Sequence, residues 1–282
     1  MKYEVKENCQ LLQFLIENIK ELSNKKIKSL LKYENILVNN KIHTEYNFLL
    51  KKGDIVSIKE YKTKKHNSNL KIIYEDKNII VVEKPAGLLT VSTNKEKEKT
   101  LYHLVSEYIK HSNKNNKIFV IHRLDRDTSG IVMFAKSEKI KNNYQNNWKE
   151  LVKKRNYIAV VEGKLEKKQG TITFPLKEVD NMVYVDKGGK PAITNYQVIK
   201  ENANYSMLTI DIKTGRKNQI RVHLKEIGHP IIGDKKYGSN INPLKRLGLH
   251  ANILEIQNFS SKKIQKFESK KPSSFDKLMK WE

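Results

Sequence analysis

The chain has 282 residues, with 55 Lys and Arg against 31 Asp and Glu, so its formal net charge is +24 at pH 7. This charge favours a polyanionic partner, with nucleic acid first, although a Lys- and Asn-rich composition alone is an alternative explanation. The single cysteine, Cys9, excludes an intrachain disulfide and a zinc site built on cysteine pairs.

The first residues show no targeting or membrane signal. No Gly follows Met1, and Lys6, Glu7 and Glu17 interrupt what could otherwise be the apolar stretch of a signal peptide. No apolar run in the chain approaches the roughly 20 residues of a membrane span. Together with the single cysteine, these features predict a cytoplasmic protein with no membrane partner.

Composition divides the chain into two domains and a connection. Residues 61–70 are polar and basic, which is typical of a linker. We therefore expect a small domain over residues 1–60 and a larger one over residues 71–282. No internal repeat is found.

The small domain is predicted to contain two short helices and a small sheet. Apolar residues from Leu11 to Ile19 recur at helical spacing, and Ser23 can cap a second helix through Leu31. Short strands are predicted at Ile36–Val38, Lys41–His43 and Ile55–Ile58. This α/β segment, with a turn at Gly53 and Asp54, resembles the S4 RNA-binding module, in which two helices and a small sheet grip structured RNA.

The larger domain is predicted to be α+β, with a mixed, largely antiparallel sheet flanked by helices and loops. A hairpin of Lys71–Tyr74 and Ile79–Glu83 is followed by a helix that Thr100 caps. The later strands are predicted at Ile131–Ala135, Tyr157–Val161, Thr171–Phe174, Met182–Val185, Ile193–Val198 and Tyr205–Ile212.

The most concentrated chemistry lies in His122–Gly130, a turn-forming run with two carboxylates, two guanidiniums and one imidazole. Asp125 lies among arginines just before a predicted strand. Nearby positive charge lowers the pKa of a carboxyl group, whereas burial raises it. The run therefore predicts an ionised carboxylate held for chemistry, and a salt-bridged surface turn is the alternative.

A third informative region is Thr214–Leu224. Ile220, His223 and Leu224 share one helical face, and Asn218 occupies the capping position. Arg221 is then expected to project from the first turn, opposite the core face. His223 is expected to be a satisfied core histidine.

Three blocks together resemble the RluA branch of the pseudouridine synthases, from about Ile72 to the end of the chain. His122–Gly130 fits the family's HRLD and DTSG motifs, and Tyr157–Gly163 fits the strand KxYxAxVxG. Gly215–His223 fits GRxxQIRVH. Arg155 stands where the family has lysine, and Asn218 where histidine is the commonest form.

The resemblance implies an RNA isomerase without cofactor or metal, in which the glycosidic bond of a uridine breaks and the base is rejoined through C5. Asp125 falls at the family's catalytic aspartate and would act as nucleophile, at C6 of the base or at C1′ of the ribose. Arg221 would lie against this carboxylate and offset its desolvation. Tyr157 would stack on the target base and accept or relay a proton when C5 is deprotonated, or serve only as a half-buried strand residue.

RNA contacts are expected from further polar residues. Arg123 would fill the gap left by the flipped uridine, or pair within the turn with Asp127. Arg126 is a candidate phosphate contact. Arg216 and Asn218 are the other predicted RNA-binding residues.

Structured RNA is the expected partner, with large-subunit ribosomal RNA first and transfer RNA second. A monomer is the default expectation. A non-catalytic RNA-binding protein remains an alternative. So does a metal-dependent nuclease that uses His122, Asp125 and Asp127, although Arg123 and Arg126 would repel a divalent cation.

Overall fold

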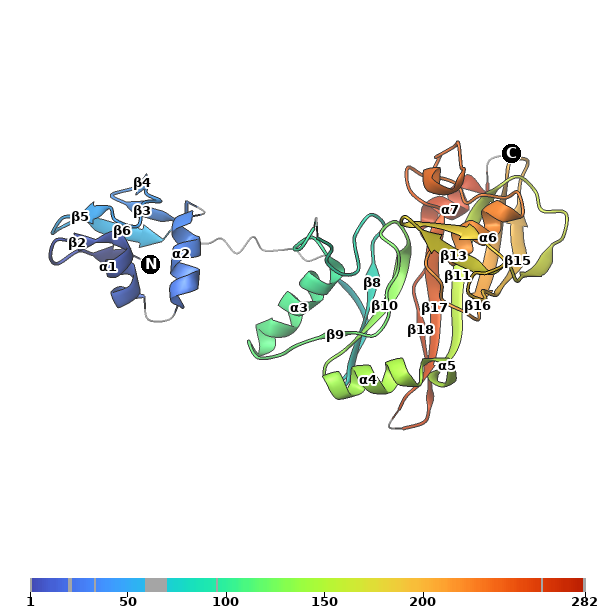
Figure 1. Ribbon diagram of the computed structural model, residues 1–282, viewed down its shortest axis with the longest axis horizontal. Coiled ribbons are helices and arrows are strands. Elements are labelled where there is room, and N and C mark those ends of the chain that lie inside the picture. Colours follow the sequence, from blue (N-terminus) through green and yellow to red (C-terminus); the bar gives the residue numbers. More distant parts are fainter. Residues whose placement is uncertain are drawn as a thin grey trace. The chain divides into compact units, whose positions relative to one another are not determined.

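The computed structural model describes residues 2–19, 22–32, 34–58, 70–94, 96–259 and 261–280. The chain divides into two compact units, Met1–Asn69 and Leu70–Glu282, each with its own hydrophobic core (Figure 1). Residues 61–69 of the expected linker lie outside the described residues. In these ranges, no helix is both long enough and apolar enough to cross a bilayer.

The smaller unit combines two short helices with a four-stranded antiparallel sheet. The helices α1 (Leu11–Asn18) and α2 (Asn24–Lys32) follow the apolar spacing, and Leu15, Ile27 and Leu31 are fully buried in the core. The sheet has the order β1-β6-β3-β4, and β2 pairs separately with β5. The strands are β1 Lys2–Glu4, β2 Cys9–Gln10, β3 Ile36–Val38, β4 Lys41–Ile42, β5 Leu49–Leu50 and β6 Ile55–Ile58.

Two turns of the smaller unit are tied together by side-chain hydrogen bonds. Asn39 and Asn40 have φ angles of 47° and 66° and close the hairpin of β3 and β4, as a two-residue turn with two left-handed positions requires. Asp54 accepts hydrogen bonds from the backbone N–H of Lys51 and from the amide of Asn39, both at 2.8 Å. These bonds, the one from Lys51 first, lower the pKa of the Asp54 carboxyl.

A ten-stranded sheet frames the larger unit. Its order is β12-β15-β16-β11-β17-β10-β8-β7, with β18 paired to β17 and β9 to β10. Of these described pairs, β10 with β17 is parallel and the others are antiparallel, which confirms the predicted α+β class. The strands, with the separate hairpin β13–β14, are β7 Lys71–Glu75, β8 Ile79–Lys84, β9 Phe119–Val120, β10 Ser129–Ala135, β11 Val152–Glu162, β12 Gln169–Ile172, β13 Leu176–Val179, β14 Met182–Val185, β15 Thr194–Glu201, β16 Tyr205–Ile212, β17 Leu249–Gln257 and β18 Ile264–Glu268.

Helices cover both faces of the half of the sheet that contains β11, because successive side chains of a strand point to opposite faces. Ala159 packs in one cluster with residues of α6 (Gln219–Glu226). Its neighbour Ile158 packs in another cluster with Phe275 of α7 (Ser273–Leu278).

The half that contains β8 is covered in the same way. Ile80 belongs to the cluster of α3 (Leu101–Ser112), which lies beside β8 and β10 in Figure 1. Ile79 belongs to the cluster that includes residues of α4 (Glu138–Asn146) and α5 (Trp148–Leu151).

The two halves of the sheet meet where β10 runs parallel to β17. The paired residues are Ser129 with His250 and Gly130 with Ala251. Gly130 has a φ of +118°, and a Cβ at this position would lie 2.1 Å from the carbonyl oxygen of Ala251. Since this oxygen belongs to a backbone, a side chain here would force the two strands apart.

We therefore expect Gly130→Ala to lower the free energy of unfolding of the larger unit by more than about 2 kcal/mol, through the close contact and the positive φ together. Gly228→Ala is the matched control. Gly228 has a φ of +85° but nothing within 4 Å of its added Cβ, so the loss should be near 1 kcal/mol, roughly the cost of the left-handed backbone alone. Urea unfolding of both variants measures the difference, and equal losses would contradict the steric argument.

Candidate active site

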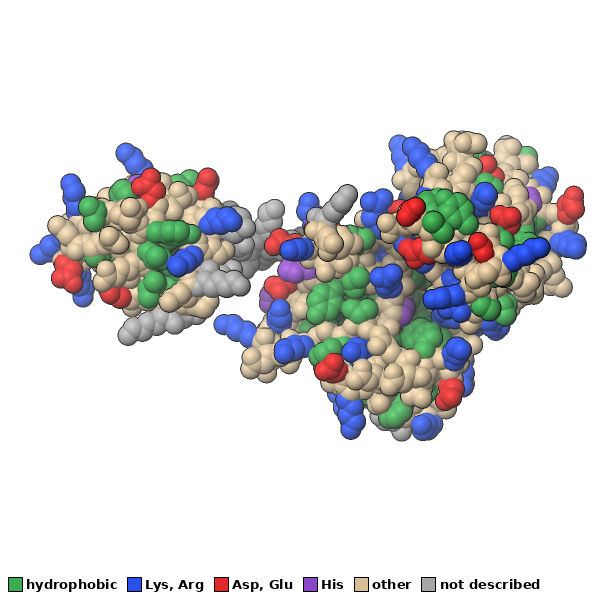
Figure 2. Space-filling model, viewed as in Figure 1, with side chains coloured by type: hydrophobic (Ala, Val, Ile, Leu, Met, Phe, Trp, Pro, Cys, Tyr) green, Lys and Arg blue, Asp and Glu red, His purple; other side chains and the backbone are tan. Residues whose placement is uncertain are grey.

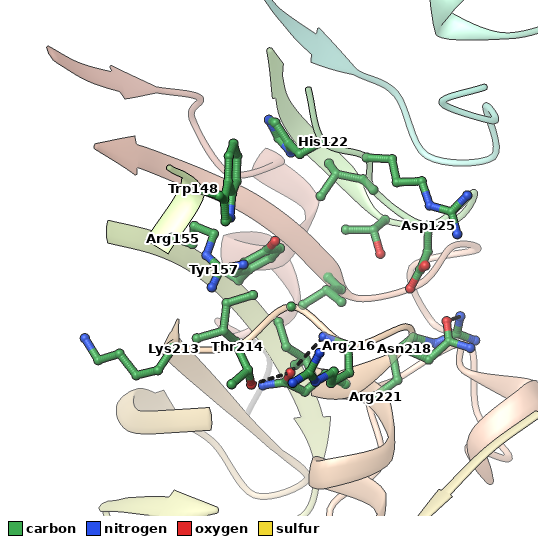
Figure 3. Close-up of a pocket in the computed structure, with 18 of the residues that line it drawn as sticks. His122, Asp125, Trp148, Arg155, Tyr157, Lys213, Thr214, Arg216, Asn218 and Arg221 are labelled. Atoms are coloured by element: carbon green, nitrogen blue, oxygen red, sulfur yellow. Dashed lines mark hydrogen bonds between the residues drawn. The ribbon is translucent and has the colours of Figure 1, made fainter. Parts of the chain in front are cut away.

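A cavity of about 520 Å³ brings together three segments that are far apart in the sequence: the turn before β10, the start of β11 and the turn that leads into α6. Tyr157 contacts both the α3 cluster and the α6 cluster, so the cavity lies where these two clusters meet. The predicted residues that line it are Asp125, Tyr157, Arg221, Arg123, Arg216 and Asn218 (Figure 3). Arg126 instead lines an adjacent cavity, and its Nε lies 3.1 Å from the Asp127 carboxylate.

Asp125 is the carboxylate of this cavity. Burial raises the pKa of its carboxyl, and the positive charges of Arg221, Arg123 and Lys84 lower it, in that order of effect. A carboxylate taken out of water protonates unless cations or hydrogen bonds stabilise its charge. Burial has the larger effect, so the pKa of Asp125 is raised from its ordinary value, and the surrounding cations limit this rise.

Lys84, at the end of β8, fixes the turn that carries Asp125. Its side chain is fully buried, and its Nζ donates to the carbonyl oxygens of Pro85, Leu88 and Arg126 at 3.0, 2.6 and 2.7 Å. Burial lowers the pKa of Lys84 to about 7. The three carbonyl acceptors favour the protonated form, because only an ammonium group has three N–H donors.

Arg221 does not pair directly with Asp125, contrary to the prediction from the sequence. Its Nη2 and Nε lie 2.7 Å from the two carboxylate oxygens of Asp234, and the two side chains are 8% and 1% exposed. Arg221 is thus buried rather than projecting from the surface of α6. Its charge still acts on Asp125, since it is the largest of the influences that lower the pKa of that carboxyl.

Asn218 occupies the N-cap position of α6, as predicted, and its carbonyl oxygen accepts a hydrogen bond from the N–H of Val222, but its side chain does not cap the helix. Asn218 adopts the left-handed conformation with φ 53° and ψ 18°, and its side chain makes no capping hydrogen bond. Instead its Nδ2 donates to the hydroxyl of Tyr237 at 2.9 Å, and its Oδ1 accepts from Nη1 of Arg221 at 3.1 Å. The buried amide therefore holds Arg221 in position, and its predicted contact with RNA gains no support from this geometry.

Gln219 organises the turn before α6. Its Oε1 accepts hydrogen bonds from the hydroxyl of Thr214 at 2.7 Å and from the backbone N–H of Arg216 at 3.0 Å. Its Nε2 donates to the carbonyl of Ile193 and to the hydroxyl of Thr194, both at 3.0 Å. The turn that presents Arg216 to the cavity is thereby attached to β15.

Tyr157 and Arg155 form the wall on β11. Burial raises the pKa of the Tyr157 phenol to about 12, so the ring carries its proton at neutral pH. A Cβ on Gly215 would lie 2.7 Å from Nη1 of Arg155. Gly215, which has no side chain, therefore leaves room for the guanidinium of Arg155 in the position that it occupies here.

His122 has a structural role. Its Nε2 accepts a hydrogen bond from the backbone N–H of Met133 at 3.1 Å, and burial lowers the pKa of the ring to about 4. Within the described ranges, no three His, Cys, Asp or Glu side chains are grouped so that they could hold a metal ion. This geometry gives the nuclease alternative no support.

A basic cavity of about 620 Å³ adjoins the first cavity and shares Asp125, Asn218 and Arg221 with it. Figure 2 shows several Lys and Arg side chains around the hollow near the middle of the larger unit. The basic residues that line the adjoining cavity, besides Arg221, are Arg126, Lys217, Lys235, Lys236, Lys245 and Arg246. Such a surface suits the phosphates of a nucleic acid.

Sequence analysis assigned no role to Asp234, Gln219 or Trp148. Asp234 lies in the polar loop after α6, and nothing in the sequence connects it to an arginine in that helix. Gln219 is part of the GRxxQIRVH block, so the resemblance was a signal that could have identified it. For Trp148, a lone tryptophan in a polar run, no comparable signal exists.

Comparison with known proteins agrees with this architecture. The family profile described as RNA pseudouridylate synthase matches residues 78–226. The uncharacterized RNA pseudouridine synthase YhcT of Bacillus subtilis is 32% identical over 260 residues, 89% of this chain and 86% of that protein. The ribosomal large subunit pseudouridine synthase D of Nitrosomonas europaea is 33% identical over 222 residues, 74% of this chain and 64% of that protein.

Among solved structures, human RNA pseudouridylate synthase domain containing 4 has the same fold, with a TM-score of 0.61 and 22% identity over 73% of this chain and 90% of that chain. The profile covers the turn with Asp125, strand β11 and helix α6, which carry the cavity residues that the motifs predict. The fold, the profile and the relatives agree with the three motif blocks. The chain belongs to the RluA family of RNA pseudouridine synthases.

Proposed function

We propose that this RNA isomerase converts uridines of large-subunit ribosomal RNA to pseudouridine, with Asp125 as the nucleophile. The observation that carries the proposal is a carboxylate in a cavity lined by Arg123, Arg216 and Arg221, with no hydrogen bond from these cations to neutralise it in the described contacts. A polyanion enters such a cavity readily, and the carboxylate stays available for covalent chemistry.

The reaction rearranges bonds within one nucleotide. The N1–C1′ bond breaks, the C5–C1′ bond forms, C5 loses its proton and N1 gains one. Atoms and electrons balance without an oxidant or reductant, so the residues of the cavity suffice in principle. Attack at C1′ and attack at C6 both start from the same ionised Asp125.

Other residues bind and orient the uridine in this proposal. Tyr157 offers an aromatic face for the base, and its pKa of about 12 keeps it a phenol that donates a hydrogen bond. Arg123 is exposed at the cavity and can stack in the space that the flipped uridine leaves. Arg126 and Arg216 are also exposed and can contact phosphates.

We assign RNA binding to the smaller unit as an S4-like module. Its two helices, its sheet and the turn at Gly53 and Asp54 support this assignment. Exposed lysines on α2 and on both turns supply positive charge: Lys28, Lys41, Lys51 and Lys52. Such lysines bind the phosphates of folded RNA without reading its sequence.

Ribosomal RNA is favoured over transfer RNA by the names of two relatives. Besides the synthase of Nitrosomonas, the ribosomal large subunit pseudouridine synthase C of Buchnera aphidicola is 32% identical over 83% of this chain and 78% of that protein. Cys9 is a free thiol, which suits the reducing cytoplasm, and we take the protein to act as a monomer.

Asp125→Asn should abolish isomerisation, with a fall in turnover of at least about 10³-fold, because the amide cannot act as the nucleophile. RNA affinity should change little. Tritium release from RNA that carries 5-tritiated uridine measures turnover, and a filter assay measures binding. Asp127→Asn removes a neighbouring carboxylate of the same turn and should keep most of the activity. Tritium release by the Asp125 variant at the normal rate would refute the assignment.

Arg221→Met should lower turnover far more than RNA affinity. Loss of the positive charge raises the pKa of Asp125 further, so the acid limb of the turnover–pH profile should move to higher pH. The variant also leaves Asp234 buried and unpaired. The double variant R221M/D234N removes both charges and should recover stability without returning the acid limb. Equal losses of turnover and affinity, with an unmoved acid limb, would indicate a phosphate contact instead.

Deletion of the gene should remove pseudouridines from large-subunit ribosomal RNA and leave those of transfer RNA in place. Chemical mapping of pseudouridine in total RNA from cells with and without the gene tests this directly. Restoration by the wild-type protein, and not by Asp125→Asn, is the control. Loss confined to transfer RNA would reverse our choice of substrate while leaving the chemistry intact.

A further inference from the structure

A third cavity, of about 560 Å³, adjoins the cavity that contains Asp125 and Tyr157, which we call the reaction cavity. The two cavities share a wall formed by Trp148, Lys149, Arg155, Ile212 and Lys213. A strand that delivers a uridine to the reaction cavity can therefore continue into this one. We call it the Trp148 cavity.

The lining of the Trp148 cavity matches the chemistry of a nucleotide. Besides the shared wall, Lys153, Lys154 and Glu150 line it, so five basic side chains stand against one acidic side chain. An aromatic ring with cations around it binds single-stranded nucleic acid, because a base stacks on the ring and phosphates meet the cations.

Trp148 is held in place on the protein side. Its ring lies 5.2 Å from the ring of His122, at an interplanar angle of 40°. His122 is in turn fixed by the backbone N–H of Met133. The indole is only partly buried, and Figure 3 shows it on the wall that also carries Arg155 and Tyr157. A partly exposed ring in a fixed position is suited to stacking.

The lysines of the cavity differ in their availability. Lys213 pairs with Asp211 at 2.7 Å. Lys153 is exposed and forms no ion pair within the described ranges, so its charge is free for a ligand. Of these two lysines, Lys153 is therefore the stronger candidate for a phosphate contact.

We propose that the Trp148 cavity holds a nucleotide next to the target uridine in the RNA strand, with its base stacked on Trp148 and its phosphate on Lys153. The proposal rests on the proposed function, because it takes the strand to be the same RNA that Asp125 modifies. It assigns this chain a substrate subsite outside the reaction cavity.

The chain has two tryptophans, Trp148 and Trp281, so replacement of Trp281 by Phe makes Trp148 the sole indole reporter. In the variant D125N/W281F, which should not turn over, a short single-stranded oligoribonucleotide should quench the emission of Trp148 in a saturable way. Anisotropy of the same oligonucleotide, labelled with fluorescein, measures binding in parallel. Failure to bind, or binding without quenching, overturns the proposal. So does equal quenching by polyglutamate, since the cavity would then accept any polyanion.

Affinity measurements give a second test. Trp148→Ala should weaken binding of the oligonucleotide roughly tenfold, and Trp148→Phe should keep most of it, because phenylalanine preserves a stacking face. Lys153→Ala should reduce the slope of log affinity against log salt by about 0.7, the value for one phosphate on a single strand. Lys139→Ala, at an exposed position of α4 outside the three cavities, is the control and should change neither.

The two proposals fail in different ways. Normal tritium release together with an unchanged KM in Trp148→Ala would overturn the subsite and leave the isomerase intact. Quenching of Trp148 by RNA, with no tritium release by the wild-type protein, would refute the proposed isomerisation and reduce the Trp148 cavity to a site that binds RNA without a target uridine beside it. Thermal unfolding of each variant, together with rescue by Trp148→Phe, separates loss of stacking from loss of structure.

Discussion

The buried ion pair between Arg221 and Asp234 is the interaction on which the site depends. Removing one partner of such a pair costs about 3–5 kcal/mol, because the other charge is left buried and alone. Arg221 of this pair also lowers the pKa of Asp125, against the larger effect of burial, which raises it. Because Asp234 accepts hydrogen bonds from Nε and Nη2 of Arg221, the guanidinium acts on Asp125 through its charge and not through a hydrogen bond. A direct bond to Asp125 would instead have engaged lone pairs that a nucleophile needs.

Lys84 is a second buried cation that acts on Asp125 through its charge. Its ammonium group is buried and bonded to carbonyl oxygens, so it contributes charge near Asp125 without competing for the carboxylate. The oxygen atoms of Asp125 thus lie near positive charges that are hydrogen-bonded to other groups. Two further cavities lined by basic residues adjoin this one. Their positive charges suit the phosphates of an RNA strand.

Sequence patterns correctly predicted features that depend on neighbouring residues in the chain, such as helix caps and apolar helix faces. Thr100 caps α3 by accepting a hydrogen bond from His103, and His223 is buried with both ring nitrogens paired, as expected. Helix α4 was not predicted, because Ile140 and Tyr144 alone mark its apolar face in a polar run. Predictions that needed tertiary contacts were less successful. The motifs correctly predicted that Arg221 lies in the same cavity as Asp125. Its ion-pair partner, Asp234, lies in a loop that comes close to Arg221 only in the folded chain.

The parallel contact between β10 and β17 has a mechanical consequence. Asp125 belongs to the half of the sheet that begins with β10, whereas Tyr157 and Arg221 belong to the half built around β11 and α6. Only two residue pairs form the ladder that joins these halves. The separation of Asp125 from Tyr157 therefore depends on how these two halves are held together. Packing also joins the halves, because Phe267 of β18 shares a cluster with Ile79 of β8, and Gln265 donates to the hydroxyl of Tyr74 in β7. The spacing between Asp125 and Tyr157 is therefore set by the fold of this unit.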